Sequence, residues 1–185
     1  LLMAEVDLIW NGGIGTFVKA SNEDPNHVSD RNNEGIRVDA SDLRCKVVGE
    51  GGNLGLTQLA RVEYALHGGR IYTDFIDNAA GVDCSDHEVN IKVLLNTAVE
   101  KGKLTVEERN ALLAEMTEEI SQIVLKNNYK QTLALSLIQL KSDSNLDLYS
   151  RYMFELARQG KIDMELERLP NEKTLIERKA KNKGL

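Results

Sequence analysis

The chain has 185 residues, of which 42% are hydrophobic and 28% are charged, and its formal net charge at pH 7 is -6. This balance is typical of a globular domain, and no apolar run approaches the roughly 18 residues that a membrane span requires. Nucleic-acid binding depends on clustered Lys and Arg, whereas the charges in the second half of this chain are mixed in sign. We therefore expect a protein that binds neither a membrane nor nucleic acid.

Two cysteines, Cys45 and Cys84, stand alone, without a CxxC pair or the spacing of a disulfide framework. Reduced thiols in a cytoplasmic protein are the simplest interpretation. Both ends are typical of a fragment, because residues 1–6 lead directly into an apolar stretch and residues 179–185 form a basic tail. We expect a longer parent protein.

Residues 1–84 contain most of the glycines and three short apolar runs of the strand type. These runs are residues 6–10, 46–49 and 70–76, each bounded by turn residues. Residues 54–67 carry an apolar stripe at helical spacing, which ends at two glycines. A strand, a helix and a strand of this length predict a βαβ unit with parallel strands. Residues 19–43 are polar and predict an irregular surface excursion.

Residues 85–185 are poor in glycine, and their apolar residues recur at helical spacing. We expect a first helix around Val89 and Val93 and a second that begins at the capping box of Thr105 and Glu108 and breaks at Asn127 and Asn128. A further helix should begin near Asn145 and end at Gly160, and a last helix should follow Pro170. The expected fold class is α/β. Residues 1–84 would be the C-terminal part of a Rossmann-like parallel sheet, and residues 85–185 an α-helical extension.

The strongest local signal joins the second strand to the helix, at Val47-Val48-Gly49-Glu50-Gly51-Gly52-Asn53-Leu54-Gly55. Its glycines are typical of a dinucleotide phosphate loop, and Asp74, about 20 residues further on, lies where a ribose-binding acid is expected. The spacing is loose, because Gly55 comes one place late. Glu50 and Asn53 favour an uncharged ligand instead, since a carboxylate repels pyrophosphate. Spacing alone leaves both interpretations open.

A second segment, residues 77–85, has small residues between Asn78 and Ser85, so that a ligand can approach its backbone closely. Ligands of open α/β sheets lie beyond the carboxyl ends of the strands, and both segments are expected to leave such ends. The bends at Asn53 and Asn78 should therefore form one wall of a cleft. At an expected helix start, the Ser85 hydroxyl is either a plain N-cap or a donor to an anion.

These two segments resemble the nucleotide-binding domain of glutamate dehydrogenases, and in particular the very large NAD-specific bacterial members. That family has a strand followed by Glu-Gly-Ala-Asn, a helix, another strand, and then Asn-Ala-Gly-Gly-Val with a serine three residues later. The matching residues here are Glu50-Gly51-Gly52-Asn53 and Asn78-Ala79-Ala80-Gly81-Val82 with Ser85. The chain departs from the family at Gly52, at Ala80, at Asn11-Gly12-Gly13 in place of Pro-Ala-Ala, and at residues 54–57 in place of a Thr-Thr-Pro run.

The resemblance implies NAD-dependent oxidative deamination of L-glutamate to 2-oxoglutarate and ammonium, in a parent that is a homo-oligomer. It also implies roles for matching residues: Asn53 and Asn78 near the nicotinamide riboside, Gly12 and Gly13 near the adenosine side, and Val82 and Ser85 in the glutamate pocket. The family's catalytic lysine and aspartate and its phosphate loop are expected upstream of this chain. We therefore expect the chain alone to have no turnover.

Two other classes of function stay open. One is a different nucleotide-binding module, in which residues 49–55 hold phosphate. The other is a non-enzymatic helical interaction module formed by residues 86–185. A metal site is not expected, although the acidic and histidine side chains of residues 83–88 are possible ligands, because acids in a first helical turn also suit the helix dipole.

Overall fold

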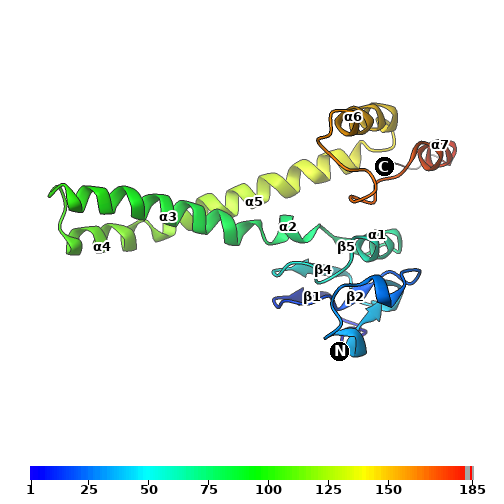
Figure 1. The fold of residues 1–185 in the computed structure, drawn as a ribbon, viewed down its shortest axis with the longest axis horizontal. Coiled ribbons are helices and arrows are strands. Elements are labelled where there is room, and N and C mark those ends of the chain that lie inside the picture. The colour runs from blue at the N-terminus through cyan, green and yellow to red at the C-terminus, as the bar shows by residue number, and fades with distance from the viewer. Residues whose placement is uncertain (182–183, 185) are drawn as a thin grey trace.

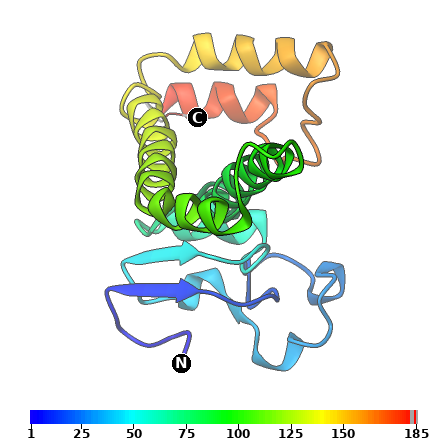
Figure 2. The same cartoon turned by 90° about the vertical axis from the view of Figure 1, so that its left-hand side faces the viewer.

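The computed structural model describes residues 1–181 and residue 184, so residues 182, 183 and 185 of the predicted basic tail lie outside the described residues. Within them, a small parallel sheet and seven α-helices make up a mixed α/β structure. In chain order the strands and helices are β1 (Leu8–Asn11), β2 (Val18–Lys19), β3 (Val38–Asp39), β4 (Val47–Glu50), α1 (Gln58–Leu66), β5 (Arg70–Ile71), α2 (Asp74–Asp77), α3 (Ala79–Glu100), α4 (Val106–Glu115), α5 (Thr117–Leu140), α6 (Leu146–Arg158) and α7 (Glu172–Ala180). Figure 1 shows the sheet and α6–α7 at the same end of the long axis, with the sheet below and α6 and α7 above, while α3, α4 and part of α5 project toward the other end. Figure 2 views the molecule from the side of these projecting helices.

The main sheet has the order β1-β4-β5, and all its strands are parallel. The β4-α1-β5 unit confirms the predicted βαβ unit, with Val48 paired to both Ile9 and Ile71. The third strand is much shorter than predicted. It ends at Ile71 because Thr73 accepts hydrogen bonds from two following backbone N–H groups, which starts the helical turn α2. The Rossmann-like character of the sheet stays a prediction.

Helix α1 packs against β5, β2 and the turn Ala40–Asp42, and it contributes Ala60 and Tyr64 to the main core. The buried residues of this core are Val18, Ala40, Cys45, Val48, Leu56, Ala60 and Tyr64. The Tyr64 hydroxyl donates a hydrogen bond of 2.9 Å to the carbonyl oxygen of Cys45, which satisfies both buried polar groups. Helix α1 begins at Gln58 rather than at residue 54, because the Thr57 side chain accepts from the N–H of Ala60 and caps it.

The excursion at residues 19–43 is packed more closely than predicted. Strands β2 and β3 pair in parallel, and three 3₁₀ turns follow the chain: Pro25–His27, Glu34–Ile36 and Ala40–Asp42. Ala20, Val28 and Ala40 are buried, so the excursion contributes apolar surface to the interior. The prediction of irregular structure was right about the short elements and wrong in placing the whole excursion on the surface.

The long helices correct two predictions. Helix α3 begins at Ala79, so Ser85 lies well inside it rather than at a helix start. Helix α5 runs unbroken through Asn127 and Asn128, and the actual break lies at Met116, between α4 and α5. The predicted capping box of α4 is confirmed by both of its hydrogen bonds. None of the helices in the described part of the chain combines the length and apolarity that a bilayer crossing needs.

Helices α6 and α7 form a small second core. Both were predicted: α6 ends just before Gly160, whose φ is +68°, and α7 follows Pro170 and is capped by Asn171. The buried residues Leu146, Met153 and Leu175 hold the two helices together.

The buried Tyr64 hydroxyl should contribute measurably to stability. In the Tyr64→Phe variant the Cys45 carbonyl loses its donor, so we expect the free energy of unfolding to fall by about 1–2 kcal/mol. Urea unfolding followed by circular dichroism measures this loss. Tyr72→Phe is the matched control, because its exposed hydroxyl contacts only the Ser136 hydroxyl at 3.2 Å, and its expected loss is below about 0.5 kcal/mol. Equal losses in the two variants would contradict the prediction.

Candidate functional site

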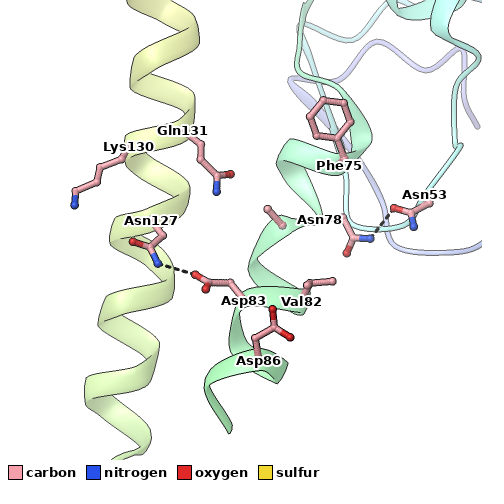
Figure 3. Close-up of a pocket in the computed structure, with 10 residues that line it drawn as sticks. Asn53, Phe75, Asn78, Val82, Asp83, Asp86, Asn127, Lys130 and Gln131 are labelled. Carbon is pink, nitrogen blue, oxygen red and sulfur yellow. Dashed lines mark hydrogen bonds between the residues drawn. The ribbon is translucent and has the colours of Figure 1, made fainter. Parts of the chain in front are cut away.

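A cleft of about 650 Å³ opens where the β4–α1 turn, the α2–α3 junction and α5 meet. Its lining residues are Asn53, Phe75, Asn78, Ala79, Val82, Asp83, Asp86, Asn127, Lys130 and Gln131. Figure 3 shows this arrangement, with the Asn53 turn on one side of α2 and α3 and helix α5 on the other. The cleft therefore combines segments that lie far apart in the sequence.

Asn53 and Asn78 form one wall of the cleft. The Nδ2 group of Asn78 donates a hydrogen bond of 2.7 Å to Oδ1 of Asn53, as Figure 3 shows. The expectation that these two bends lie together is confirmed. This bond leaves Nδ2 of Asn53 as a donor and Oδ1 of Asn78 as an acceptor, and neither has another hydrogen-bond partner among the described residues. The wall can thus donate to and accept from one uncharged polar ligand.

Gly12 and Gly13 follow β1 and lie beside the Asn53 turn rather than in the cleft. The N–H groups of Gly51 and Gly52 both donate to the carbonyl of Asn11, at 2.8 and 3.1 Å. A Cβ atom on Gly52 would lie 2.5 Å from the carbonyl oxygen of Gly13, so only glycine allows this close approach of the two backbones.

The Trp10 ring explains two more glycines of the turn. A Cβ atom on Gly49 or Gly51 would lie 2.6 or 2.7 Å from the ring, which rests directly on this backbone. Trp10 is nevertheless 61% exposed, so its other face is available to a ligand or to another part of the protein. Packing against an aromatic ring therefore accounts for these glycines, and they do not by themselves indicate a phosphate loop.

Val82 and Ser85 lie on α3, and the structure separates their positions. Val82 lines the cleft and exposes 62% of its surface. Ser85 is exposed but is not among the lining residues. Its expected place in a first helical turn was wrong, because the amides at the α3 N-terminus lie before it. Its contact with a substrate carboxylate stays a prediction.

Glu50 does not face a ligand, contrary to the sequence-based interpretation. Its side chain is fully buried and receives two hydrogen bonds from Arg61, Nε to Oε2 at 2.7 Å and Nη2 to Oε1 at 3.0 Å. Oε1 also accepts from the N–H of Leu56 at 3.1 Å. Such a bidentate charged pair has high geometric specificity. Glu50 therefore fixes the position of the β4–α1 turn through contacts within the protein.

Buried Asp74 and half-buried Asp77 place two further carboxyl groups against the β4–α1 turn. Oδ2 of Asp74 accepts from the N–H of Leu54 at 2.7 Å and lies 3.2 Å from Nη2 of Arg61. Oδ2 of Asp77 accepts from the N–H of Glu50 at 2.9 Å. Burial raises the pKa of the Asp77 carboxyl above its usual value. The Asp74 carboxylate is thus occupied by contacts within the protein and is not positioned to accept a hydrogen bond from a ribose hydroxyl.

The carboxyl groups of Glu50, Asp74 and Asp77 bear on the two interpretations of the turn. Three carboxylates below residues 49–55 would repel a pyrophosphate, and a single guanidinium, that of Arg61, balances them. The start of α1, where a phosphate loop would bind its ligand, is already capped by the Thr57 side chain. The geometry therefore favours an uncharged part of a ligand at this turn.

Helix α5 supplies part of the site that sequence reasoning missed. Nδ2 of Asn127 donates to Oδ2 of Asp83 at 2.9 Å, as drawn in Figure 3, and Nδ2 of Asn128 donates to the carbonyl of Ile76 at 2.9 Å. The two asparagines fasten α5 to α2 and α3. Their sequence signal, a polar interruption of an apolar helix, was visible but was interpreted as a helix break.

The acidic residues of α3 make local contacts. Nδ1 of His87 lies 3.2 Å from a carboxylate oxygen of Asp83, which also holds Asn127. Among residues 1–181 and 184, no three His, Cys, Asp or Glu side chains converge as a metal-ligand set. The expected absence of a metal site stays a prediction.

The raised pKa of Asp77 should appear as a pH dependence of stability. The folded state keeps this proton at pH values above 3.8 where the unfolded state has lost it, so the carboxyl lowers stability as the pH rises through that window. In Asp77→Asn this decrease is absent, while the amide oxygen still accepts from Glu50. We expect the free energy of unfolding of the variant, relative to that of the unsubstituted chain, to increase as the pH rises from below 3.8 into the neutral range.

Urea unfolding at a series of pH values tests this expectation. Asp24→Asn is the control of opposite sign, because the N–H of Asn26 lowers the pKa of Asp24, whose carboxylate therefore adds stability that is lost as the pH falls. If the free energies of unfolding of Asp77→Asn and of the unsubstituted chain changed with pH in parallel, the pKa of Asp77 would not be raised by folding.

Comparison with known proteins identifies the family. Residues 1–138 match the family described as "Bacterial NAD-glutamate dehydrogenase, catalytic domain". Proteins named NAD-specific glutamate dehydrogenase are similar over all 185 residues: that of Pseudomonas aeruginosa is 58% identical, that of Halomonas elongata 54% and that of Mycobacterium tuberculosis 46%. The chain spans only 11% to 12% of the length of these relatives. Because the match to the family covers well over half of its residues, the chain belongs to the bacterial NAD-glutamate dehydrogenase family.

Proposed function

We propose that this chain forms the nicotinamide-facing wall of an NAD-specific glutamate dehydrogenase, which converts L-glutamate to 2-oxoglutarate and ammonium. The observation that supports the proposal most is the pairing of Asn53 with Asn78 across two turns that border one cleft. The names of the similar proteins supply the substrate and the cofactor.

The side chains of the cleft fit one end of NAD and not the other. A donor on Asn53 and an acceptor on Asn78 suit a carboxamide or a ribose hydroxyl, which are uncharged and hydrogen-bond in both directions. The carboxylates below the turn disfavour pyrophosphate. The nicotinamide riboside is therefore the part that Asn53 and Asn78 would hold. Gly12 and Gly13, exposed after β1, would leave room for the adenosine side.

The reaction defines what the residues of this chain would do. A bound NAD would supply the acceptor for the hydride of the glutamate α-carbon, and hydrolysis of the resulting iminium would release ammonium and leave 2-oxoglutarate. Asn53 and Asn78 would orient the reacting face, because correct positioning of two reactants removes much of the barrier. Val82 would present an apolar surface that excludes water from the cleft. The Ser85 hydroxyl, further along α3, would donate to a glutamate carboxylate.

Wider properties of the parent belong to the same proposal. A role in amino-acid catabolism follows from the reaction, and homo-oligomeric assembly follows from the family. Buried Cys45 and exposed Cys84 are both free thiols, which supports a reducing, cytoplasmic location. Continuation of the β1-β4-β5 sheet into a Rossmann-like domain would supply the pyrophosphate site.

The role of Asn53 can be tested in the complete gene product. Asn53→Ala removes the free donor and the partner of Asn78, so we expect the KM for NAD to rise about 5- to 30-fold while the KM for glutamate changes less than about 2-fold. Initial rates of NADH formation measure both constants. Asn110→Ala, an exposed substitution on α4, is the control and should leave both unchanged. An unchanged KM for NAD in Asn53→Ala would remove the main support of the proposal.

The chain alone should lack activity. The cleft offers groups that position a cofactor, whereas the catalytic lysine and aspartate implied by the resemblance are expected elsewhere in the parent. Purified 185-residue chain mixed with glutamate and NAD should form no NADH above the blank, with the complete gene product as positive control. A glutamate-dependent rate from the chain alone would show that its own residues carry the chemistry.

A further inference from the structure

The residue after Asn53 has an unusual backbone conformation. Leu54 has a φ of +61°, in the left-handed region that side chains with a Cβ disfavour. Its side chain is 62% exposed, so burial of that side chain does not impose this conformation. Both backbone groups of Leu54, in contrast, are hydrogen-bonded to side chains.

Two side chains from distant parts of the chain hold the two backbone groups of Leu54. Oδ2 of Asp74 accepts from its N–H at 2.7 Å, and Oγ1 of Thr16 donates to its carbonyl oxygen at 2.8 Å. Both side chains belong to buried residues, with exposed fractions of 9% for Asp74 and 8% for Thr16. Neither residue lines the cleft.

Asp74 and Thr16 are themselves held in place. Nη2 of Arg61 lies 3.2 Å from Asp74, and the same guanidinium is fixed by the fully buried Glu50. On the other side, the N–H of Thr16 donates to Asp30 at 2.8 Å, and Nε of Arg37 donates to the Thr16 carbonyl at 2.9 Å. The hydroxyl and carboxylate that hold Leu54 therefore have little freedom to follow a relaxing turn.

We propose that Asp74 and Thr16 are positioning residues for the cofactor site: they hold Leu54 in the left-handed region and so direct Asn53 toward Asn78. If Leu54 relaxed to a common negative φ, the peptide between residues 53 and 54 would rotate and Asn53 would turn with it. This inference rests on the proposed function of the cleft as the nicotinamide site. It adds two residues that would influence NAD binding without touching NAD.

The experiment uses the complete gene product and two readouts. The variants are Thr16→Val, which removes the hydroxyl, and Asp74→Ala, which removes the acceptor of the Leu54 N–H. Each should raise the Kd for NAD, measured by calorimetric titration, about 5- to 10-fold. Each should also speed hydrogen exchange in the peptide covering residues 51–57 of the NAD-free protein.

A control and a rescue separate positioning from general destabilisation. Tyr64→Phe weakens the same core without touching the turn, so it should leave the Kd and the exchange of residues 51–57 unchanged. Leu54→Asn, an exposed change to a residue that adopts the left-handed region more readily, should restore most of the affinity that Thr16→Val loses. A merely structural role of Thr16 would not be rescued by an exposed side chain.

Combination with Asn53→Ala gives the deciding result. In that background Thr16→Val and Asp74→Ala should change the Kd less than about 2-fold, because they act through Asn53. Equal losses with and without Asn53, failure of the Leu54→Asn rescue, or unchanged exchange at residues 51–57 would overturn the inference. A complete protein that does not bind NAD, or whose affinity is insensitive to Asn53→Ala, would instead overturn the proposed function.

Discussion

The buried ion pair between Glu50 and Arg61 is the interaction on which the rest of the site depends. Burying two charges is costly, and it is compensated only where the geometry is good and the remaining polar atoms are bonded. Here the guanidinium makes two bonds to Glu50, contacts Asp74 and reaches Gln58, and Glu50 also accepts from the Leu56 backbone. One side chain thus joins the last residue of β4 to α1 and α2.

This constraint accounts for the glycines of the turn without invoking a phosphate ligand. After β4 the backbone packs against the Trp10 ring and then against the backbone of Gly13. It then turns back, so that the N–H of Leu56 donates to Glu50. A side chain at Gly49, Gly51 or Gly52 would collide on this path, whatever ligand the turn holds. Glycine-rich junctions between a strand and a helix therefore need the surrounding contacts before a phosphate role is inferred from them.

The sequence predicted what local patterns determine. The βαβ unit, the capping box at Thr105 and the meeting of Asn53 with Asn78 follow from periodicity, capping chemistry and the rule that carboxyl ends of parallel strands share an edge. It did not predict features that depend on distant partners. Glu50 was assigned to a ligand because its partner Arg61 lies on the next helix, and Ser85 was placed at a helix start because α3 begins earlier than the polar residues suggested.

Asn127 shows why the helical half cannot be separated from the site. In the sequence of a single helix, a polar residue among apolar ones interrupts the apolar pattern. When a second helix places a carboxylate beside it, the same amide can form a hydrogen bond between the two helices. Asn127 binds Asp83 and Asn128 binds the Ile76 carbonyl, so α5 lies against the α2–α3 junction that carries Asn78. The same contact makes α5 a wall of the cleft. A division at residue 84 falls inside α3 and separates residues that line one cleft, which favours a shared role of both halves over an independent helical interaction module.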